Sequence, residues 1–358
     1  MAAHLIHAQE VGGSTPPAAI KQTTGEGIFR MTLDIIIPHY KEPWELCRYL
    51  FDSIALQRGV PLSQVKVIVV NDGDDCVLDA SAWREYPYTV DYLIKPHGGV
   101  SAARNAGLME SKADYVMFCD ADDGFLNNYA LHLIFSAMQE GADFIVSNFV
   151  EETFDAEGNA TIISHDTDLT FMHGKAYRRE FLLEHDLLFD PAMTIHEDGY
   201  FNMIVYATAQ HEGKQKNITT PIYLWRWNDN SVVRSNKKDF VLKTYDHVMQ
   251  TRIGICDELK RRGYMEDYET AVVMTVMNSY YDFQKTSYHT IENRSYKRRA
   301  EKAFKGFWNK FGKDFQNCTN QRVAEIARVA RENAYKNGML FEQVSIRDWL
   351  KHIENEAK

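Results

Sequence analysis

The feature that most constrains this chain is a regular alternation of short apolar runs with segments of helical spacing, which begins at Leu33. Leu33–Ile37 and Val65–Val70 are mostly apolar runs, and Glu45–Leu56 between them carries apolar residues at helical spacing. This alternation is typical of a parallel sheet covered by helices, so the sequence predicts an α/β fold. Further predicted strands are 90–94, 115–119, 144–149 and 218–225, and further predicted helices are 101–111, 129–139, 174–184 and 200–209.

From about residue 236 the pattern is helical almost to the end, with predicted helices at 239–262, 266–285, 296–311, 320–337 and 345–355. A chain of 358 residues corresponds to about two domains at roughly 150 residues each. We therefore expect an extension of unknown role in 1–30, an α/β domain in 31–235 and a helical domain in 236–358.

Composition excludes several classes of protein. Hydrophobic residues make up 45% and charged residues 25%, as in ordinary globular proteins. The formal net charge of −10 disfavours a protein that coats nucleic acid through overall positive charge. The five cysteines are scattered without a Cys-x-x-Cys pair, the apolar runs are far shorter than the ~20 residues of a membrane helix, and no secretory signal is evident. We expect a cytoplasmic protein without a membrane span.

Polar residues follow three of the predicted strands. They are Pro38–Glu42, Asn71–Asp75 and Asp120–Asp123. In open α/β sheets ligands bind at the carboxyl ends of the strands, so these segments are candidates for a site. Asp120 and Asp122 lie at i and i+2, where both carboxylates of an extended segment point the same way and suit a hard divalent cation. Taken alone, an acidic turn explains the same residues as well.

A glycine pair, Gly98-Gly99, opens the predicted helix that contains Arg104. A helix start offers unpaired amide donors and the positive end of the dipole to a diphosphate, and Arg104 would add a counter-charge. The alternative is a plain loop into a helix that packs through its small residues.

These segments closely resemble, in order and spacing, the motifs of family 2 inverting glycosyltransferases of the GT-A fold. The residues that carry the resemblance are 35–41, 69–75, 99–107, 118–123 and, later, His196–Asn202, and the match covers about residues 33 to 234. It implies a Rossmann-like mixed, mainly parallel sheet flanked by helices, with a C-terminal helical region on the acceptor side or at a homo-oligomer contact.

The resemblance also implies roles for single residues. Asp198 would be the general base with Glu197 beside it, and Asp122 and Asp120 would bind Mn²⁺ or Mg²⁺. The nucleotide-sugar donor, a UDP-sugar, would contact Pro38, Tyr40, Asn71, Asp72, Gly99, Arg104, Asp120, Arg226 and Arg234. The family more often has Asp at the position of Asn71. A cap for the helix near Tyr200 is the structural alternative for Glu197-Asp198.

Two kinds of residue leave alternatives open. The aromatic and arginine-rich segment 225–234 is either a loop over the donor or a packing seam between domains. His39, His97, His173 and His196 could each supply a third metal ligand, and His196 is favoured because it adjoins Glu197.

The segment 285–313 holds nine Lys or Arg and two acidic residues, and these charges are interleaved with Tyr296, Phe304, Phe307, Trp308 and Phe311. It is either a surface for a polyanion, such as nucleic acid, a teichoic-type polymer or an anionic membrane, or an amphipathic helix whose aromatic side faces the core.

Three hypotheses follow: a metal-dependent inverting glycosyltransferase acting on a surface glycan or polymer, the same chemistry on modified DNA bases, or an inactive sugar-nucleotide-binding scaffold.

Overall fold

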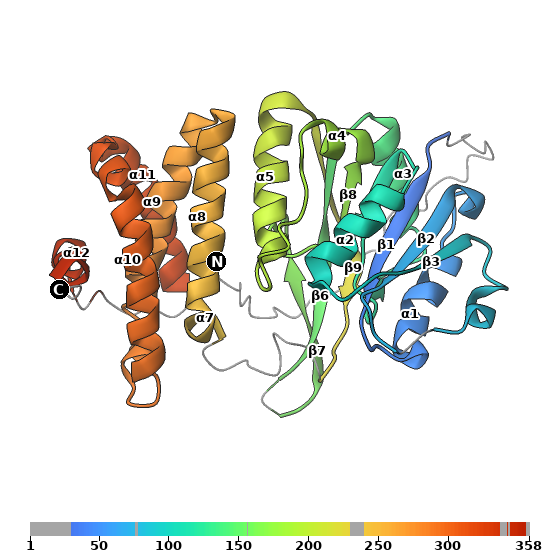
Figure 1. Cartoon of the computed structure of the whole chain (residues 1–358), viewed down its shortest axis with the longest axis horizontal. Coiled ribbons are helices and arrows are strands. Elements are labelled where there is room, and N and C mark those ends of the chain that lie inside the picture. Colours follow the sequence, from blue (N-terminus) through green and yellow to red (C-terminus); the bar gives the residue numbers. More distant parts are fainter. Residues whose placement is uncertain are drawn as a thin grey trace, which may run out of the picture.

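The central sheet is mixed, with helices on both faces (Figure 1). The computed structural model describes residues 30–75, 78–155, 157–229, 240–336, 342 and 344–355. Within them the strands follow the order β3-β2-β1-β4-β8-β6-β9-β5, with β7 paired to β6. The parallel strands are β1 (Leu33–His39), β2 (Val65–Asn71), β3 (Thr89–Ile94) and β4 (Tyr115–Phe118). The mixed half contains β5 (Gly124–Phe125), β6 (Phe144–Phe154), β7 (Ala160–His165), β8 (Lys175–Arg178) and β9 (Gln215–Trp225).

Side-chain alternation explains why the parallel strands are apolar throughout. In β1, Ile35 and Ile37 belong to the core on one face of the sheet, whereas Ile36 belongs to the core on the other. Because both faces are covered by helices, neither set of positions can be polar. The sequence expectation of a mainly parallel, two-sided sheet is confirmed for this half.

One face carries α1 (Trp44–Ala55) and α3 (Ala130–Gln139), and the other carries α2 (Gly99–Glu110), α4 (Arg179–Glu184) and α5 (Glu197–Glu212). Helix α2 approaches β1 closely at Gly107, where an added Cβ would lie 2.3 Å from Cγ2 of Ile36. This contact packs the C-terminal part of α2 against β1 and β2, since the same Cβ would lie 3.3 Å from Cγ2 of Val70. Short 3₁₀ turns occur at Leu62–Gln64, Ala80–Trp83 and Thr286–His289.

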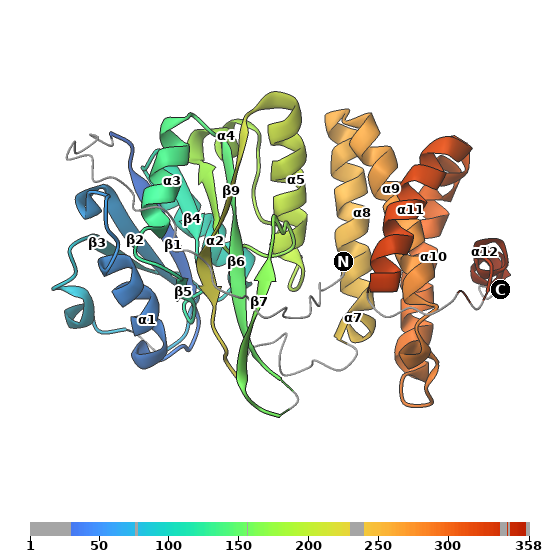
Figure 2. The same cartoon turned by 180° about the vertical axis from the view of Figure 1, so that it is seen from behind.

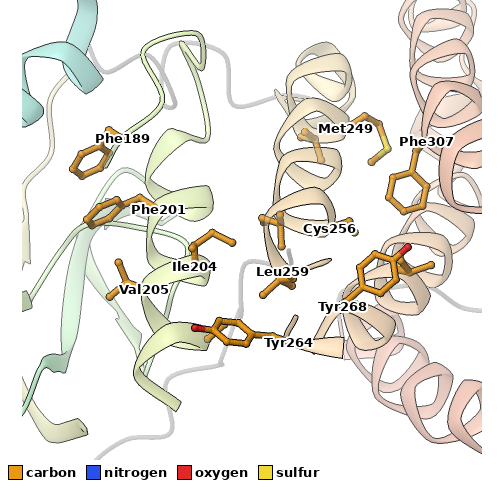
Figure 3. Packing of buried hydrophobic residues seen from close by; sticks show 14 of the residues in the cluster. Phe189, Phe201, Ile204, Val205, Met249, Cys256, Leu259, Tyr264, Tyr268 and Phe307 are labelled. Atoms are coloured by element: carbon orange, nitrogen blue, oxygen red, sulfur yellow. The ribbon is translucent and has the colours of Figure 1, made fainter. Parts of the chain in front are cut away.

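The C-terminal helices stack beyond α5 (Figures 1 and 2). They are α7 (Phe240–Lys243), α8 (Tyr245–Arg262), α9 (Met265–Asp282), α10 (Arg294–Asn317), α11 (Asn320–Lys336) and α12 (Ile346–Asn355). Ile204 of α5 lies opposite Leu259 of α8, and Phe307 of α10 packs behind α8 (Figure 3). One apolar core therefore runs without interruption from the sheet through α5 into the helical region. In the part of the chain that the structure describes, no helix is both long and apolar enough to cross a bilayer.

Some sequence expectations are wrong in detail. Residues 174–184, expected as one helix, form β8 followed by α4, and 239–262 is divided at Thr244 between α7 and α8. β8 is only four residues long, so its period-two pattern is too brief to compete with the helical spacing that follows. The expected domain boundary at 235 lies outside the described residues.

Candidate functional site

The three polar segments leave the sheet at one edge. His39 pairs with Asn71, the last residues of β1 and β2, and Ile36 pairs with Phe118, the last residue of β4. The residues after each strand therefore start side by side, as the sequence predicts from parallel strand order. Pro38 lies within β1, one position before its end.

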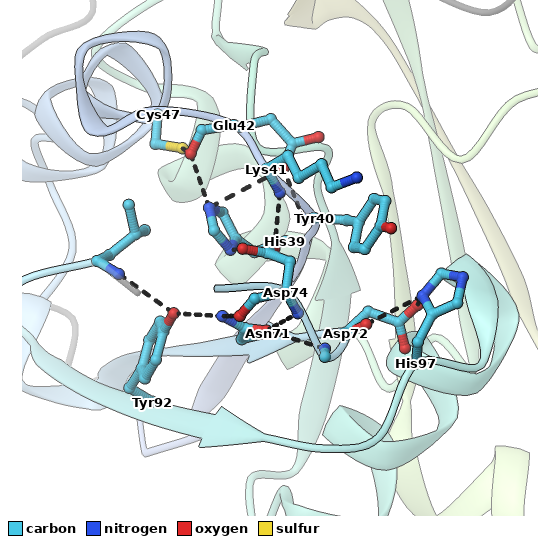
Figure 4. Close-up of polar contacts among 12 residues, drawn as sticks. His39, Tyr40, Lys41, Glu42, Cys47, Asn71, Asp72, Asp74, Tyr92 and His97 are labelled. Carbon is cyan, nitrogen blue, oxygen red and sulfur yellow. Dashed lines mark hydrogen bonds and ion pairs between the residues drawn. The ribbon is translucent and has the colours of Figure 1, made fainter. Parts of the chain in front are cut away.

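The turn after β2 is built by the side chain of Asn71, which is completely buried. Its Oδ1 accepts hydrogen bonds from the amides of Gly73 (2.9 Å) and Asp74 (3.0 Å), and its Nδ2 donates to the hydroxyl of Tyr92 (3.0 Å). Figure 4 draws this network. Asn71 therefore shapes the turn through contacts within the protein, and its partner Tyr92 was not identifiable from a local sequence pattern.

The carboxylate of Asp72 accepts hydrogen bonds from the amide groups at the start of α2. Oδ1 accepts from the amide of Gly98 (3.0 Å) and from Nζ of Lys95 (2.5 Å), and Oδ2 accepts from the amide of Gly99 (2.7 Å). Oδ2 also lies 2.8 Å from Nδ1 of His97. Burial raises the pKa of Asp72, but the hydrogen bonds from Lys95, Gly99 and Gly98 outweigh it, so the net effect is a lowered pKa.

The amides of Gly98 and Gly99, expected from the sequence to face a diphosphate, are thus already bonded to Asp72. In this structure the carboxylate of Asp72 is the anion at this helix start, and the diphosphate contact expected from the sequence stays a prediction.

Tyr40 is the accessible residue of the β1 segment. Its side chain is 40% exposed, and its ring stacks on His97 with centroids 4.7 Å apart. His39 beside it is buried, and its Nε2 lies 2.8 Å from the carbonyl oxygen of Glu42 (Figure 4). Tyr40 therefore offers an aromatic surface at the site, whereas His39 holds the loop.

Arg104 joins two motifs that lie far apart in the sequence. Nη2 donates to Oδ1 of Asp120 (3.0 Å), and Nη1 donates to Oε1 of Glu197 (2.8 Å). The guanidinium is buried, with its carbon 5.3 Å from the centre of the Phe189 ring. Burial alone would lower the pKa of Arg104, but Asp120, Glu197 and Asp198 raise it, so the side chain stays charged.

Asp198 lies beside this bridge, in the first turn of α5. Its Oδ1 accepts from the amide of Gly199 (2.9 Å), and the residue is partly exposed. Burial of the carboxyl and the neighbouring charge of Glu197 raise its pKa to about 8, although Arg104 acts in the opposite direction. His196, the residue immediately before α5, has a left-handed backbone (φ 64°), which costs free energy in a residue other than glycine.

The acidic segment after β4 is held by the end of β9. Asp123 is buried, and it accepts hydrogen bonds from the hydroxyl of Tyr223 (2.9 Å) and the amide of Arg226 (3.0 Å). Asp122 Oδ2 accepts from Nδ2 of Asn228 (2.7 Å), and its carbonyl oxygen accepts from Nη1 of Arg226 (3.2 Å). Segment 226–228 therefore lies directly against the acidic residues, while Arg234 lies outside the described residues.

Among the described residues, Asp120, Asp123 and His173 have ligand atoms within 4.8 Å of one another. Burial lowers the pKa of His173 to about 3, so its imidazole is neutral. Its Nδ1 is buried without a hydrogen-bond partner, 3.5 Å from Oδ2 of Asp123. Two carboxyl groups and a neutral imidazole form a donor set that fits Mn²⁺ better than Mg²⁺, whose ligands are oxygen atoms.

The histidine in this group differs from the one that the sequence favoured. His196 Nε2 lies 3.4 Å from Oγ1 of Thr244, and its ring contacts Phe240, so it faces α7. His173 follows β7 by several residues and reaches the acidic segment only through the sheet order. Sequence adjacency to Glu197 was therefore a misleading signal.

Comparisons with known proteins agree with this geometry. Residues 34–197 match the model of the family described as "Glycosyl transferase family 2". The chain is 27% identical over 223 residues to the uncharacterized glycosyltransferase EpsJ of Bacillus subtilis, covering 56% of this chain and 62% of EpsJ. It is 23% identical over 286 residues to a poly(ribitol-phosphate) beta-glucosyltransferase of Bacillus spizizenii, covering 76% of this chain and 43% of that protein.

Thus the chain spans less than two thirds of the length of either relative. Among solved structures, S. aureus TarS 1-349 in complex with UDP superposes with a TM-score of 0.57 at 15% identity, covering 91% of each chain. Fold, motif order and family match agree: residues 34–197 form a family 2 glycosyltransferase domain, and the fold is of the GT-A type.

Proposed function

We propose that this protein transfers a sugar, with inversion, from a nucleotide-sugar donor to a hydroxyl group of an acceptor, which is a surface glycan or polymer. The observation that carries the proposal is the Arg104 bridge, because it brings Asp120 and Glu197 together beside Asp198. One hydrogen-bonded network thereby joins a candidate donor-binding residue to the segment that carries the candidate base.

The two adjacent carboxylates of α5 have different environments, which supports different roles. Glu197 is buried and ion-paired with Arg104, so it is poorly placed to accept a proton. Asp198 is partly exposed and has a raised pKa, as expected of a general base that must take a proton near neutral pH. We assign Asp198 as the base and Glu197 as the residue that fixes its position.

Inversion requires a single displacement, for which one base is sufficient. The base takes the proton of the acceptor hydroxyl group while the oxygen of that hydroxyl group attacks the anomeric carbon of the sugar. The bond between this carbon and the nucleoside diphosphate breaks, and the diphosphate departs. A bound Mn²⁺ or Mg²⁺ would neutralise the charge that develops on the departing diphosphate. Asp120 and Asp122 would hold the cation, with Asp123 and His173 as the neighbouring candidates.

A UDP-sugar is the donor that the comparisons favour, since the TarS structure was solved with UDP. Tyr40 would stack on the nucleotide base of the donor, and Arg226 would lie near the donor's phosphates through its contact with Asp122. The four cysteines in the described part of the chain form no disulfide bond, and nucleotide sugars are generally cytosolic, which supports a cytoplasmic site for the reaction.

The test is an assay of purified protein with Mn²⁺ and a panel of UDP-sugars, followed by determination of the anomeric configuration of the transferred sugar by NMR. Asp198→Asn and Asp122→Ala should each abolish transfer, whereas Glu110→Gln, an exposed position at the end of α2, should be fully active. Full activity of Asp198→Asn, or retention of configuration, would refute the proposal.

A further inference from the structure

The exposed face of α10 is uniformly basic. Its accessible positions include Arg294, Arg298, Arg299, Lys302, Lys310 and Lys313, and no acidic residue of this helix is classed as exposed. Phe304, Phe307 and Phe311 lie on the opposite face and are buried. At 1.5 Å per residue, the 24 residues of α10 form a stripe roughly 36 Å long in a chain whose net charge is −10.

Four of these cations have no side-chain partner within the described part of the chain, namely Arg294, Arg298, Lys302 and Lys313. Others on the same helix are neutralised: Lys310 lies 2.5 Å from Asp257, and Lys297 lies 3.6 Å from Glu301. The unpaired cations recur along the helix and point to solvent. They therefore attract an extended anion more strongly than a single small one.

A hollow lies beside this stripe, next to α12. It is about 350 Å³ in volume and is lined by Lys305, Trp308, Asn309, Lys313, Gln316 and Glu354 among others. Its lysine and amide side chains can contact the phosphates and the hydroxyl groups of a ligand. The hollow thus gives this basic surface a concave region in which part of a ligand can bind.

The stripe is connected to the candidate base through α7. Arg299 of α10 donates to the carbonyl oxygen of Lys243, and His196, which precedes Glu197, contacts Phe240 and Thr244 at either end of α7. The N-terminal end of α10 lies at the same end of the molecule as α7 (Figures 1 and 2). A long molecule on α10 could therefore extend toward Asp198.

We propose that the exposed face of α10 binds the acceptor, and that this acceptor is a flexible phosphate-bearing chain of polyols or sugars. The inference rests on the proposed glycosyl transfer. Phe304, Phe307, Trp308 and Phe311 of α10 are buried, so these rings are not available to stack on nucleic-acid bases or to insert into a membrane. A flexible polyanion requires only the spaced cations and the adjoining hollow.

The test uses the triple variant Arg298→Glu/Lys302→Glu/Lys313→Glu. Its matched control is Arg58→Glu/Arg84→Glu/Lys112→Glu, which reverses three exposed cations of the α/β part. Fluorescently labelled poly(ribitol phosphate) is titrated into each full-length protein at several salt concentrations, and thermal unfolding verifies that both variants are folded. We expect the α10 variant to lose roughly tenfold or more in affinity, the control to bind like the wild type, and binding to weaken with salt.

Equal binding by the two variants would overturn the inference. Tighter wild-type binding to single-stranded DNA or to phosphatidylglycerol vesicles than to the polymer, with the same loss in the α10 variant, would also overturn it in favour of that ligand. Hydrolysis of UDP-sugars by the wild type is measured separately. Its absence would remove the proposed function, whereas the polymer titration alone decides whether α10 binds a polyanion.

Discussion

Nη1 of Arg104 donates a hydrogen bond to Oε1 of Glu197 over 2.8 Å, so the second turn of α2 is bonded to the first turn of α5. The same guanidinium holds Asp120 at the end of β4. A single buried cation thus sets the spacing between the acidic segment and the candidate base.

Replacing Arg104 by Ala should destabilise the protein by about 3–5 kcal/mol, because Glu197 would remain buried without its counter-charge. Activity should fall at least about a hundredfold, since Asp120 and Asp198 would lose their fixed spacing. Urea unfolding and kcat/KM measure the two effects. Arg104→Lys keeps the charge and should recover part of the stability, and an unchanged unfolding midpoint in Arg104→Ala would contradict the bridge.

The raised pKa of Asp198 predicts a pH profile. Only the ionised carboxylate can accept a proton, so kcat/KM should rise with pH and level off above an apparent pKa of about 8. Glu197 and Asp120 raise this pKa and Arg104 lowers it, so Glu197→Gln should shift the profile toward lower pH.

Stability should respond in the opposite direction. A carboxyl whose folded pKa is raised destabilises the folded state as pH increases from about 4, its ordinary value, to about 8. Above that range Asp198→Asn should therefore unfold at a higher urea concentration than the wild type. Equal midpoints at high pH would indicate that Asp198 ionises normally in the folded protein.

The lowered pKa of Asp72 predicts the opposite dependence of stability on pH. Its folded pKa is lowered, so its contribution to stability is present above the unfolded value of about 3.9 and is lost as pH falls through the folded pKa. Asp72→Ala should cost about 1–3 kcal/mol near neutral pH by leaving the amides of Gly98 and Gly99 unpaired. Denaturation at a series of pH values measures this. The difference in the free energy of unfolding between Asp72→Ala and the wild type should become smaller at acidic pH. A difference that stays constant would show that the charge of Asp72 does not stabilise the start of α2.

His173 can be tested as a ligand separately from its role in packing. The ring is stacked against Tyr223, with centroids 5.0 Å apart, and His173→Phe preserves an aromatic ring while it removes both nitrogen atoms. We expect Mn²⁺ binding, followed by electron paramagnetic resonance, to weaken about tenfold or more, with little change in thermal unfolding. Unaltered Mn²⁺ affinity in this variant, together with a loss in Asp122→Ala, would assign the cation to the Asp120–Asp122 pair alone.

Close packing of α2 on the sheet predicts the effect of a single methyl group. Gly107→Ala would bring its Cβ to 2.3 Å from Cγ2 of Ile36, so we expect a loss of about 1–3 kcal/mol. Gly306→Ala on α10 is the matched control, because its Cβ would meet no atom within 4 Å and helix propensity should increase stability by about 0.5–1 kcal/mol. Similar effects of both substitutions on the unfolding midpoint would contradict this packing.

How far the sequence predicts this structure depends on how local each signal is. The ends of β1, β2 and β4 follow directly from apolar runs that stop at polar residues, so the edge that carries Asn71, Asp72 and Asp120 could be located. The roles of Asn71 and Asp72 could not, because their partners Tyr92 and Lys95 come from β3 and the residue that follows it.

Long-range contacts account for the other differences. His173 meets Asp123 because β8 pairs between β4 and β6, a topology that no short pattern encodes. β7, with mostly exposed side chains, has no apolar alternation to detect, and β5 is only two residues long. The basic residues of α10 form a pattern that can be recognised in the sequence. Only the packing of Phe304, Phe307 and Phe311 shows which face of the helix remains accessible.

The apolar core that passes from the sheet through α5 to α10 links folding of the two halves. Leu259 and Ile204 belong to the same core, so removing the C-terminal helices would expose a large hydrophobic surface of α5 to water. The two halves are therefore not interchangeable modules: the catalytic half depends on the helical half for its solubility, and the chain should melt in one cooperative transition.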